Sequence, residues 1–224
     1  MSRTDRPLVV TIDGPAASGK SSTARLVAER LGARHVDSGS LYRAVTAVRL
    51  RSGDEPPLWT EASVLASARR VVLRPGETTL IACIDGEPGE DEMRAAPVTA
   101  LVSLVAKMPR VRAWVNAQVR EAARSQDIVV DGRDMGTAVF PDAQVKVWMV
   151  ALPSERARRR IIQRTGQEPA AAELDREAAA LERRDYQDSE QTKPASDAVW
   201  IDTTGISQAD QVARVMELAK AVSR

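Results

Sequence analysis

The sequence has few of the residues on which several classes of protein depend. It contains one cysteine, Cys83, one histidine, His35, and only 3% aromatic residues. A single cysteine excludes an internal disulfide and fits a reducing cytoplasm, so we expect Cys83 to be a small core residue. One histidine, far from that cysteine in the sequence, does not provide a zinc-ligand cluster. The shortage of aromatic residues argues against stacking surfaces for single-stranded nucleic acid.

Long hydrophobic runs and an excess of one charge are also missing. No segment approaches 18 uninterrupted apolar residues, so a transmembrane helix is not expected, and residues 1–7 lack the apolar core of a secretory signal. The 32 Lys and Arg residues balance 31 Asp and Glu residues, which removes any general attraction to nucleic acid or membrane. We therefore predict a cytoplasmic protein with small-molecule partners, no nucleic acid and no membrane. We also predict a monomer.

The 224-residue chain instead shows alternating apolar strands and amphipathic helices. Strands are predicted at 8–13, 34–37, 128–131, 145–150 and 198–202. Helices are predicted at 20–31, 40–51, 98–106, 111–123, 155–164, 170–184 and 207–222, with Ser40 and Ser154 as N-caps. This alternation is typical of a parallel sheet in a single α/β domain covering 1–224. Residues 71–92 differ, because two short strands around a turn predict a small β insertion.

The strongest motif lies between the first strand and the first helix. Residues 14–21, GPAASGKS, fit the P-loop pattern G-x-x-x-x-G-K-[ST], which a chance match would produce in roughly two such sequences per thousand. Its backbone N–H groups and helix N-terminus suit nucleotide phosphates, Lys20 can reach the β and γ phosphates, and Ser21 can ligate Mg²⁺. We predict an ATP site made of Gly14, Pro15, Ala16, Ala17, Ser18, Gly19, Lys20, Ser21 and Ser22.

A carboxylate ends the apolar strand at 128–131. In P-loop enzymes an acidic residue at such a strand end holds Mg²⁺ directly or through water. Asp131 is therefore predicted to share the metal with Ser21.

Three further features suggest a second anionic substrate. Residues 37–43, DSGSLYR, follow a strand and bring a hydroxyl and an arginine to a helix start, and Arg133 follows the strand that ends at Asp131. Ligands of α/β sheets bind at such carboxyl ends. The helix at 155–164 carries Arg156, Arg159, Arg160 and Arg164. A solvated surface helix would also explain these arginines, but a P-loop kinase needs arginines on the transferred phosphoryl group and a lid that excludes water.

Several blocks of residues together resemble the bacterial cytidylate kinases. They are IDGP at 12–15 with the rest of the P-loop, DSG and YR within 37–43, PRVR at 109–112, and DGRDMGT with FPDA within 131–143. The tail resembles the family at 184–185, 188–189, 197–198 and 201–204, so the similarity extends from Val9 to Val215. The combination of DGRDMGT with D-S-G-x-x-Y-R is highly specific.

The resemblance implies both the fold and the reaction. The fold is a P-loop kinase core with a five-stranded parallel sheet, a monophosphate-binding region at 38–125 that contains the small β insertion, and a mobile helical lid at 154–192. The reaction is Mg²⁺-dependent transfer of the γ-phosphoryl group of ATP to CMP or dCMP, giving ADP with CDP or dCDP. The residues expected to act on that group are Lys20, Arg133, Arg156 and Arg160.

Motif matching also implies the CMP site. Ser38, Arg43 and Arg133 would lie around the phosphate and sugar. Ser103, Arg112 and Asp134 would recognise cytosine, whose amino donor and N3/O2 acceptors suit a carboxylate and a guanidinium. Arg184 and Asp188 would meet the ribose hydroxyls. A helix-surface or core serine is the alternative for Ser103, although we favour the base contact.

One segment departs from the family pattern. The family carries D-x-x-R before the last strand, whereas Gln191 stands three residues after Asp188 in this sequence. Glutamine cannot neutralise a phosphate, so we expect Asp188 to carry most of the ribose recognition.

Two other functions fit a P-loop. One is a kinase with another small acceptor, such as UMP or a non-nucleotide alcohol, which would not need the set formed by Ser103, Arg112 and Asp134. The other is a nucleotide-driven switch, but the sequence contains no N-K-x-D-like guanine motif.

Overall fold

One sheet forms the centre of the computed structural model, which describes residues 6–189 and 192–222. Its core strands are β2 (Arg34–Asp37), β6 (Ile128–Gly132), β1 (Val9–Asp13), β7 (Val145–Val150) and β8 (Val199–Asp202), in that spatial order. All neighbouring pairs among these five strands are parallel, which confirms the predicted core. The carboxyl ends of β1, β2 and β6 therefore meet at one edge, where the P-loop follows β1.

The β insertion extends this sheet, which therefore has eight strands and not five. Its strands are β3 (Val71–Pro75), β4 (Thr79–Ile84) and β5 (Glu87–Pro88). β4 pairs parallel to β2, while β3 and β5 run antiparallel to β4. Leu80, Ala82, Cys83 and Ile84 of β4 are buried, whereas Ile81 is exposed. A separate hairpin would bury too little surface to be stable, so the insertion gains its cover by joining the core sheet.

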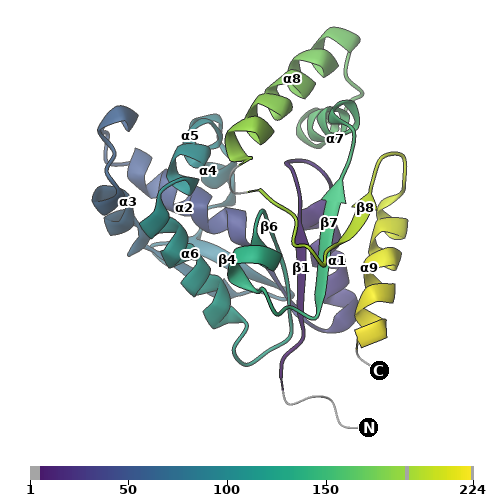
Figure 1. Cartoon of the computed structure of the whole chain (residues 1–224). Coiled ribbons are helices and arrows are strands. Elements are labelled where there is room, and N and C mark those ends of the chain that lie inside the picture. The colour runs from purple at the N-terminus through teal and green to yellow at the C-terminus, as the bar shows by residue number, and fades with distance from the viewer. Residues whose placement is uncertain (1–5, 190–191, 223–224) are drawn as a thin grey trace.

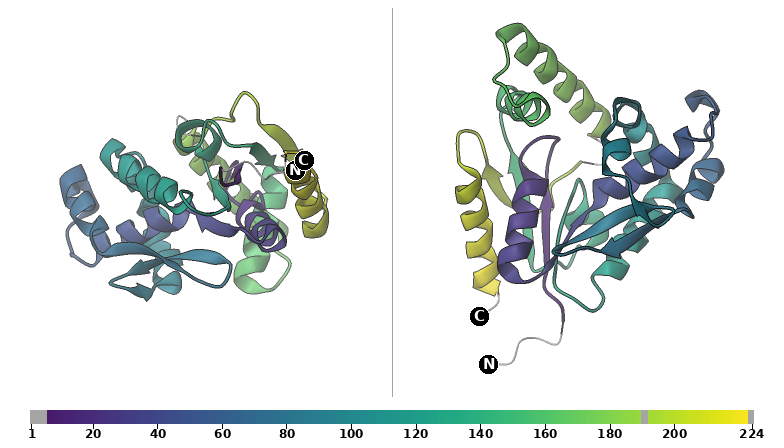
Figure 2. Two further views of the ribbon diagram at one scale, coloured as in Figure 1. Left: turned by 90° about the horizontal axis from the view of Figure 1, so that it is seen from below. Right: turned by 180° about the vertical axis from the view of Figure 1, so that it is seen from behind.

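Helices cover both faces of the sheet. α1 (Lys20–Leu31) and α9 (Gln208–Val222) lie side by side on one face (Figure 2). The opposite face is covered by α2 (Ser38–Leu50), α3 (Glu61–Ala68), α5 (Ala96–Ala106) and α6 (Pro109–Ala122). β6 shows the arrangement in its sequence, since Ile128 and Val130 enter the core on the α2 side and Val129 enters the core on the α1 side.

A pair of helices stands above the carboxyl edge of the sheet (Figure 1). It consists of α7 (Pro153–Thr165) and α8 (Ala171–Asp188), which pack against each other and correspond to the predicted lid region. Three short elements complete the described chain: η1 (Pro56–Leu58), α4 (Glu90–Arg94) and the π-helical turn η2 (Met135–Val139).

Both predicted N-caps, Ser40 and Ser154, are wrong. Helix α2 begins at Ser38, because the Asp37 side chain accepts a hydrogen bond from the Ser40 backbone N–H and so caps the helix earlier than expected. Helix α7 begins at Pro153 with Leu152 at the N-cap and no side-chain cap, since proline at the first helical position needs no N–H partner. Ser154 is therefore inside that helix.

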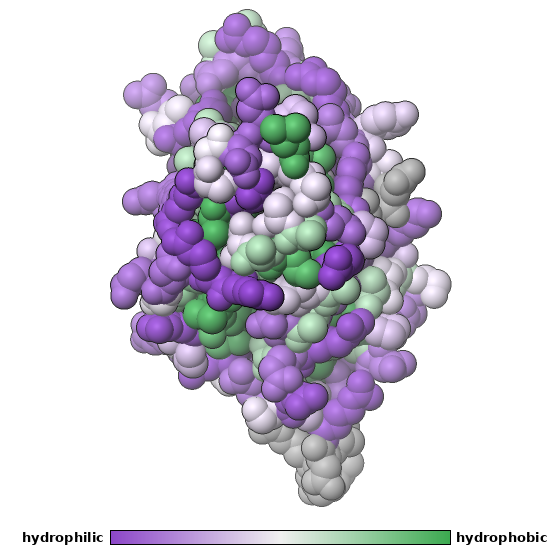
Figure 3. All heavy atoms as spheres, turned by 90° about the vertical axis from the view of Figure 1, so that its left-hand side faces the viewer, coloured by the Kyte–Doolittle hydropathy of each residue, from purple (hydrophilic) through white to green (hydrophobic). Residues whose placement is uncertain are grey.

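The described helices include none that is both long and apolar enough to span a bilayer. On the flank turned toward the viewer in Figure 3, the side of α3 and α5, hydrophobic residues form small separate areas among hydrophilic ones.

Candidate active site

The first glycine of the P-loop lies directly against the neighbouring strand, where no other residue fits. Gly14 has φ 147°, and a Cβ atom there would lie 2.1 Å from the Met149 carbonyl oxygen of β7. Pro15 and Ser18 shape the loop from within, through the hydrogen bond from Ser18 Oγ to Pro15 O. The other predicted ATP-site residues line a pocket of about 1010 Å³: Ala16, Ala17, Gly19, Lys20, Ser21 and Ser22.

Lys20 lies buried at the floor of this pocket. Its Nζ atom donates a hydrogen bond to the Pro15 carbonyl oxygen at 2.6 Å. Burial, with the nearby charge of Arg133, lowers the pKa of Lys20 to about 7. Asp131, Asp13 and Asp37 partly oppose this decrease, and phosphate oxygens entering the loop would add negative charge beside the ammonium group.

Ser21 and Asp131 meet beside the lysine. Ser21 Oγ donates to Asp131 Oδ2 at 2.5 Å. Burial opposes ionisation of Asp131, but hydrogen bonds from His35 and Ser21 outweigh it and hold its pKa below the usual value. A hydroxyl and a carboxylate are hard oxygen ligands that suit Mg²⁺, which usually takes one or two protein ligands and completes its shell with phosphates and water. No cluster of three or more His, Cys, Asp or Glu residues suited to a metal occurs in the described parts of the chain.

Asp13 connects the P-loop strand to the block at 131–137. Its two carboxylate oxygens accept the backbone N–H groups of Met135 and Gly136, at 3.0 and 2.8 Å. The start of η2 is thereby fixed next to β1, and the side chain of Asp134 is held at the pocket wall. Burial raises the pKa of Asp13 to about 6 against the effect of these two hydrogen bonds.

The three residues predicted to read cytosine come together at the far end of the pocket. Ser103 of α5, Arg112 of α6 and Asp134 all line it. Arg112 Nη2 donates to Asp134 Oδ2, and Arg112 Nη1 also donates to the Ala106 carbonyl oxygen at 3.1 Å. Burial raises the pKa of Asp134, while the Arg112 guanidinium opposes that rise. Ser103 thus faces the pocket and is not simply a core residue.

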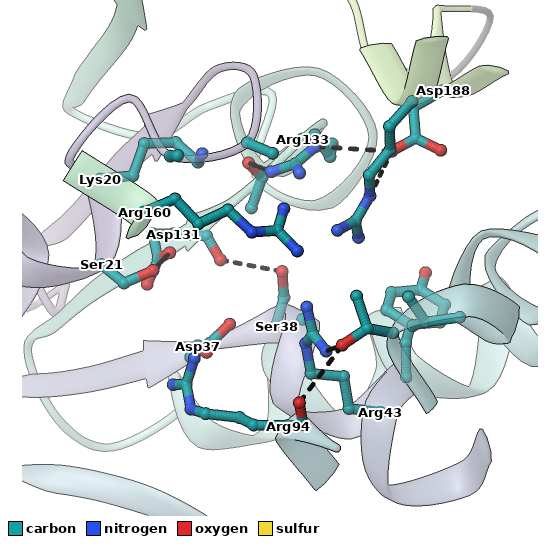
Figure 4. A pocket seen from close by; sticks show the side chains of 18 of the residues that line it. Lys20, Ser21, Asp37, Ser38, Arg43, Arg94, Asp131, Arg133, Arg160 and Asp188 are labelled. Carbon is teal, nitrogen blue, oxygen red and sulfur yellow. Dashed lines mark hydrogen bonds and ion pairs between the residues drawn. The ribbon is translucent and has the colours of Figure 1, made fainter. Parts of the chain in front are cut away.

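Arginines occupy the space between the two ends. Figure 4 shows Lys20, Arg133 and Arg160 directing their charged ends into one space, with Arg43 facing them. Arg43 donates to Thr99 Oγ1 at 3.0 Å, and Arg160 pairs with Glu177 at 3.1 Å.

Asp188 lies between two arginines of this space. Its Oδ2 atom is 4.0 Å from Arg133 Nε and 3.7 Å from Arg184 Nε. Burial and the neighbouring arginines lower the pKa of Arg184 to about 10. All eight residues predicted to bind CMP therefore line the same pocket.

Arg156 is in a different position from the other predicted catalytic residues. It is buried and is not among the residues that line the pocket. Its guanidinium donates to the Ala16 carbonyl oxygen at 3.1 Å and to Asp185 at 2.5 Å, so it joins α7 to both the P-loop and α8. Arg159 and Arg164 of the same helix do line the pocket.

The pocket also contains residues that the motifs did not indicate. Arg94 lies on the one-turn helix α4, just after the predicted β insertion at 71–92, and nothing local in the sequence indicates its position. Asp37 and Tyr42 belong to the DSGSLYR block, so that motif could have indicated them. Burial and the neighbouring Asp131 raise the pKa of Asp37. Gln191, the predicted departure, lies outside the described residues.

The parallel sheet, the P-loop between β1 and α1, and a pocket that joins the lysine to a group of arginines define a P-loop kinase. Residues 10–221 match the family described as Cytidylate kinase. The chain belongs to the cytidylate kinase family.

Curated relatives agree over almost the whole chain. A protein of Geobacillus kaustophilus (strain HTA426) named Cytidylate kinase is 40% identical over 219 residues, covering 95% of this chain and 96% of its own. Proteins of the same name from Mycobacterium leprae (strain Br4923) and Limosilactobacillus reuteri (strain DSM 20016) are 38% and 37% identical. The coverage is 95% of this chain in both cases, with 96% and 95% of the respective relatives.

Proposed function

We propose that this chain transfers the γ-phosphoryl group of ATP to CMP or dCMP, with Mg²⁺, in cytoplasmic pyrimidine nucleotide metabolism. One observation carries the proposal: a single pocket is lined by the P-loop lysine at the start of α1, by Ser103, Arg112 and Asp134 on the side of α5 and α6, and by a group of arginines. A kinase that transfers a phosphoryl group between two nucleotides needs a triphosphate site, a reaction space and a base site in one cavity.

At the triphosphate end, the backbone and Lys20 do the binding. The N–H groups of the loop and of the first turn of α1 would hold the phosphates, and Lys20 would move from Pro15 O to the transferred group. Ser21 and Asp131 would hold Mg²⁺, which would screen the charge of the phosphate oxygens. The residues then contribute alignment and charge, without any covalent intermediate.

In the middle, arginines would receive the acceptor phosphate. Arg43 is held by the Thr99 hydroxyl and Arg133 by Asp188, contacts that a doubly charged phosphate can replace. Arg184, which shares Asp188 with Arg133, would meet the ribose hydroxyls. Arg160, from the lid helix α7, would approach the transferred group as the lid closes and excludes water. Arg156 would serve as a hinge contact, since it binds the P-loop and α8 together.

At the far end, the base would be chosen by hydrogen-bond polarity. The Asp134 carboxylate accepts from the cytosine amino group, and Arg112 donates to N3 and O2. Uracil presents a carbonyl oxygen in place of that amino group, so it would face the carboxylate with the wrong polarity.

The direct test is ADP production from ATP and Mg²⁺ with CMP, dCMP, UMP, AMP and GMP in turn. CMP and dCMP are expected to give much the highest kcat/KM. Slow hydrolysis that is unaffected by any of the five acceptors would refute the proposal.

A further inference from the structure

His35 is the single histidine of the chain. It lies next to Asp131, which with Ser21 forms the candidate Mg²⁺ site. It sits on β2, where its side chain is buried and its residue is 5% exposed. Its Nε2 atom is 2.7 Å from Asp131 Oδ1, and its Nδ1 atom is 3.3 Å from Thr79 Oγ1 on β4. It does not line the nucleotide pocket, so it cannot touch the substrates directly.

The Asp131 carboxylate therefore has two different partners. Its Oδ1 atom contacts His35 Nε2 on the neighbouring strand β2, at 2.7 Å. Its Oδ2 atom accepts a hydrogen bond from Ser21 Oγ of the P-loop, at 2.5 Å. A carboxylate held by one oxygen can still rotate about its final bond, but a second hydrogen bond on the other oxygen fixes its plane. The backbone is fixed as well, because Ser38 Oγ donates to the Asp131 carbonyl oxygen at 2.8 Å.

We infer that His35 is a positioning residue, which fixes Asp131 so that Oδ2 is presented to Ser21 and to the divalent-cation complex of a nucleoside triphosphate. Partners behind a metal-binding carboxylate orient it, and their loss typically weakens metal affinity or activity by about 10- to 100-fold. This inference rests on the proposed function only in requiring that the P-loop binds a nucleotide with its cation. It does not depend on CMP being the acceptor.

A purely structural role for His35 makes a different prediction. An apolar side chain of similar size would then fill the same space, and nucleotide binding would change equally with and without Mg²⁺. A positioning role predicts that the loss appears only when the cation is present. It also predicts that a polar replacement that reaches Asp131 restores binding.

The experiment compares His35→Leu with His35→Gln in the full chain, using calorimetric titration with ATP, with and without Mg²⁺ and without CMP. His35→Leu should weaken ATP binding about 10-fold or more with Mg²⁺ and less than about 3-fold without it. His35→Gln, whose amide can still donate to Oδ1, should stay within about 3-fold of the wild type in both conditions. Cys83→Ala, which removes another buried side chain of the same sheet, is the matched control and should leave the Mg²⁺ effect unchanged.

Equal losses with and without Mg²⁺, or a His35→Gln protein as weak as His35→Leu, would overturn the inference. If His35→Leu does not fold, His35→Asn replaces it, because its shorter amide stays polar but does not reach Oδ1. Turnover of CMP by the wild type tests the proposed function separately.

A spectroscopic measurement gives a second readout. Since the chain has one histidine, its ring signals in an NMR spectrum of untagged protein need no assignment. Asp131→Asn should shift those signals in the absence of any ligand, and so should Mg²⁺ with ATP in the wild type. Ring signals that respond to neither change would show that His35 does not hold the carboxylate.

Discussion

The two ends of the pocket are built in different ways. The proposed triphosphate end comes from nine consecutive residues, and its shape is set by the backbone, as the contact of Gly14 with β7 shows. The acceptor end takes side chains from α2, α5, α6, α8 and the segment after β6. Its charged groups contact one another: Arg112 pairs with Asp134, and Arg133 and Arg184 share Asp188.

This difference indicates how each end should respond to its ligand. A backbone loop is already formed, so the triphosphate end should need little more than movement of Lys20. The ion pairs at the acceptor end must exchange partners when the substrate binds. Breaking each pair costs free energy, which new contacts with the phosphate or the base then offset. The triphosphate end should therefore fail when one group is removed, while losses at the acceptor end should be graded.

The largest effect is expected from breaking the triphosphate end with Lys20→Ala. A charge placed for the transition state contributes several kcal/mol, so kcat should fall at least about 100-fold while the circular dichroism spectrum stays unchanged. The measurement is the steady-state rate with saturating ATP and CMP. Lys220→Ala, at an exposed position on α9, is the control and should retain full activity. Retention of more than about a tenth of wild-type activity would contradict the role given to Lys20.

The second prediction concerns the base end, where Arg112→Ala and Asp134→Ala should each raise the KM for CMP. Each leaves a buried polar partner unsatisfied, at about 1–3 kcal/mol, which corresponds to roughly 5- to 150-fold. The KM for ATP should change less than about 3-fold, since neither residue belongs to the P-loop. The double variant should lose less than the sum of the two, because it leaves no unpaired charge. Equal losses for CMP and ATP would show that the pair supports the fold and not the base.

The same contrast explains how far the sequence could be interpreted. The core strands and the P-loop follow from local patterns, since apolar runs and a contiguous motif determine them. The family resemblance predicts site roles for Asp131, Arg133 and Asp134 together, because all three belong to one sequence block. Arg94 could not be found in this way, because its place in the pocket depends on how α4 packs against α2 and α5.

The N-cap residues and the strand pairing of the β insertion could not be predicted from the sequence for a related reason. Ser40 and Asp37 are both good N-cap residues, and only the strand ending at Asp37 decides between them. The pairing of β4 with β2 joins residues about 44 positions apart, as the contact of His35 with Thr79 illustrates. No local pattern contains that information.

A third prediction tests the shared carboxylate at the acceptor end. Asp188→Ala should raise the KM for CMP by about 10-fold, because it removes the expected ribose contact and leaves Arg133 and Arg184 to repel each other. Steady-state kinetics with CMP varied at saturating ATP measure this. Asp175→Ala, on the same helix but outside the pocket, is the control. A harmless Asp188→Ala would mean that the ribose is held elsewhere in the lid.

The smallest effect is expected at Asp13, where the two ends are joined. Its pKa is raised to about 6, so the folded protein binds a proton that the unfolded chain releases near pH 3.8. The stability linked to this group is fully present below about pH 4 and is lost as the pH rises through 6. Between pH 5 and 7 the loss should be about 1 kcal/mol. Asp13→Asn cannot titrate, and it keeps one acceptor for the N–H groups of Met135 and Gly136.

The free energy of unfolding of both proteins, measured in urea at pH 5, 6 and 7, checks this. Asp13→Asn should be the less stable protein at pH 5, because both oxygens of the protonated carboxyl can still accept an N–H, whereas the amide nitrogen of asparagine cannot. The difference in unfolding free energy should narrow by about 1 kcal/mol at pH 7. Other titrating groups cancel in the comparison, since the two proteins differ only at this position. A gap that stays constant would mean that Asp13 is ionised throughout, with its two backbone hydrogen bonds outweighing its burial. Asp13 would then be a permanent negative charge beside Lys20. Its charged hydrogen bonds to Met135 and Gly136 would link the two ends of the pocket more strongly than those of a neutral carboxyl group.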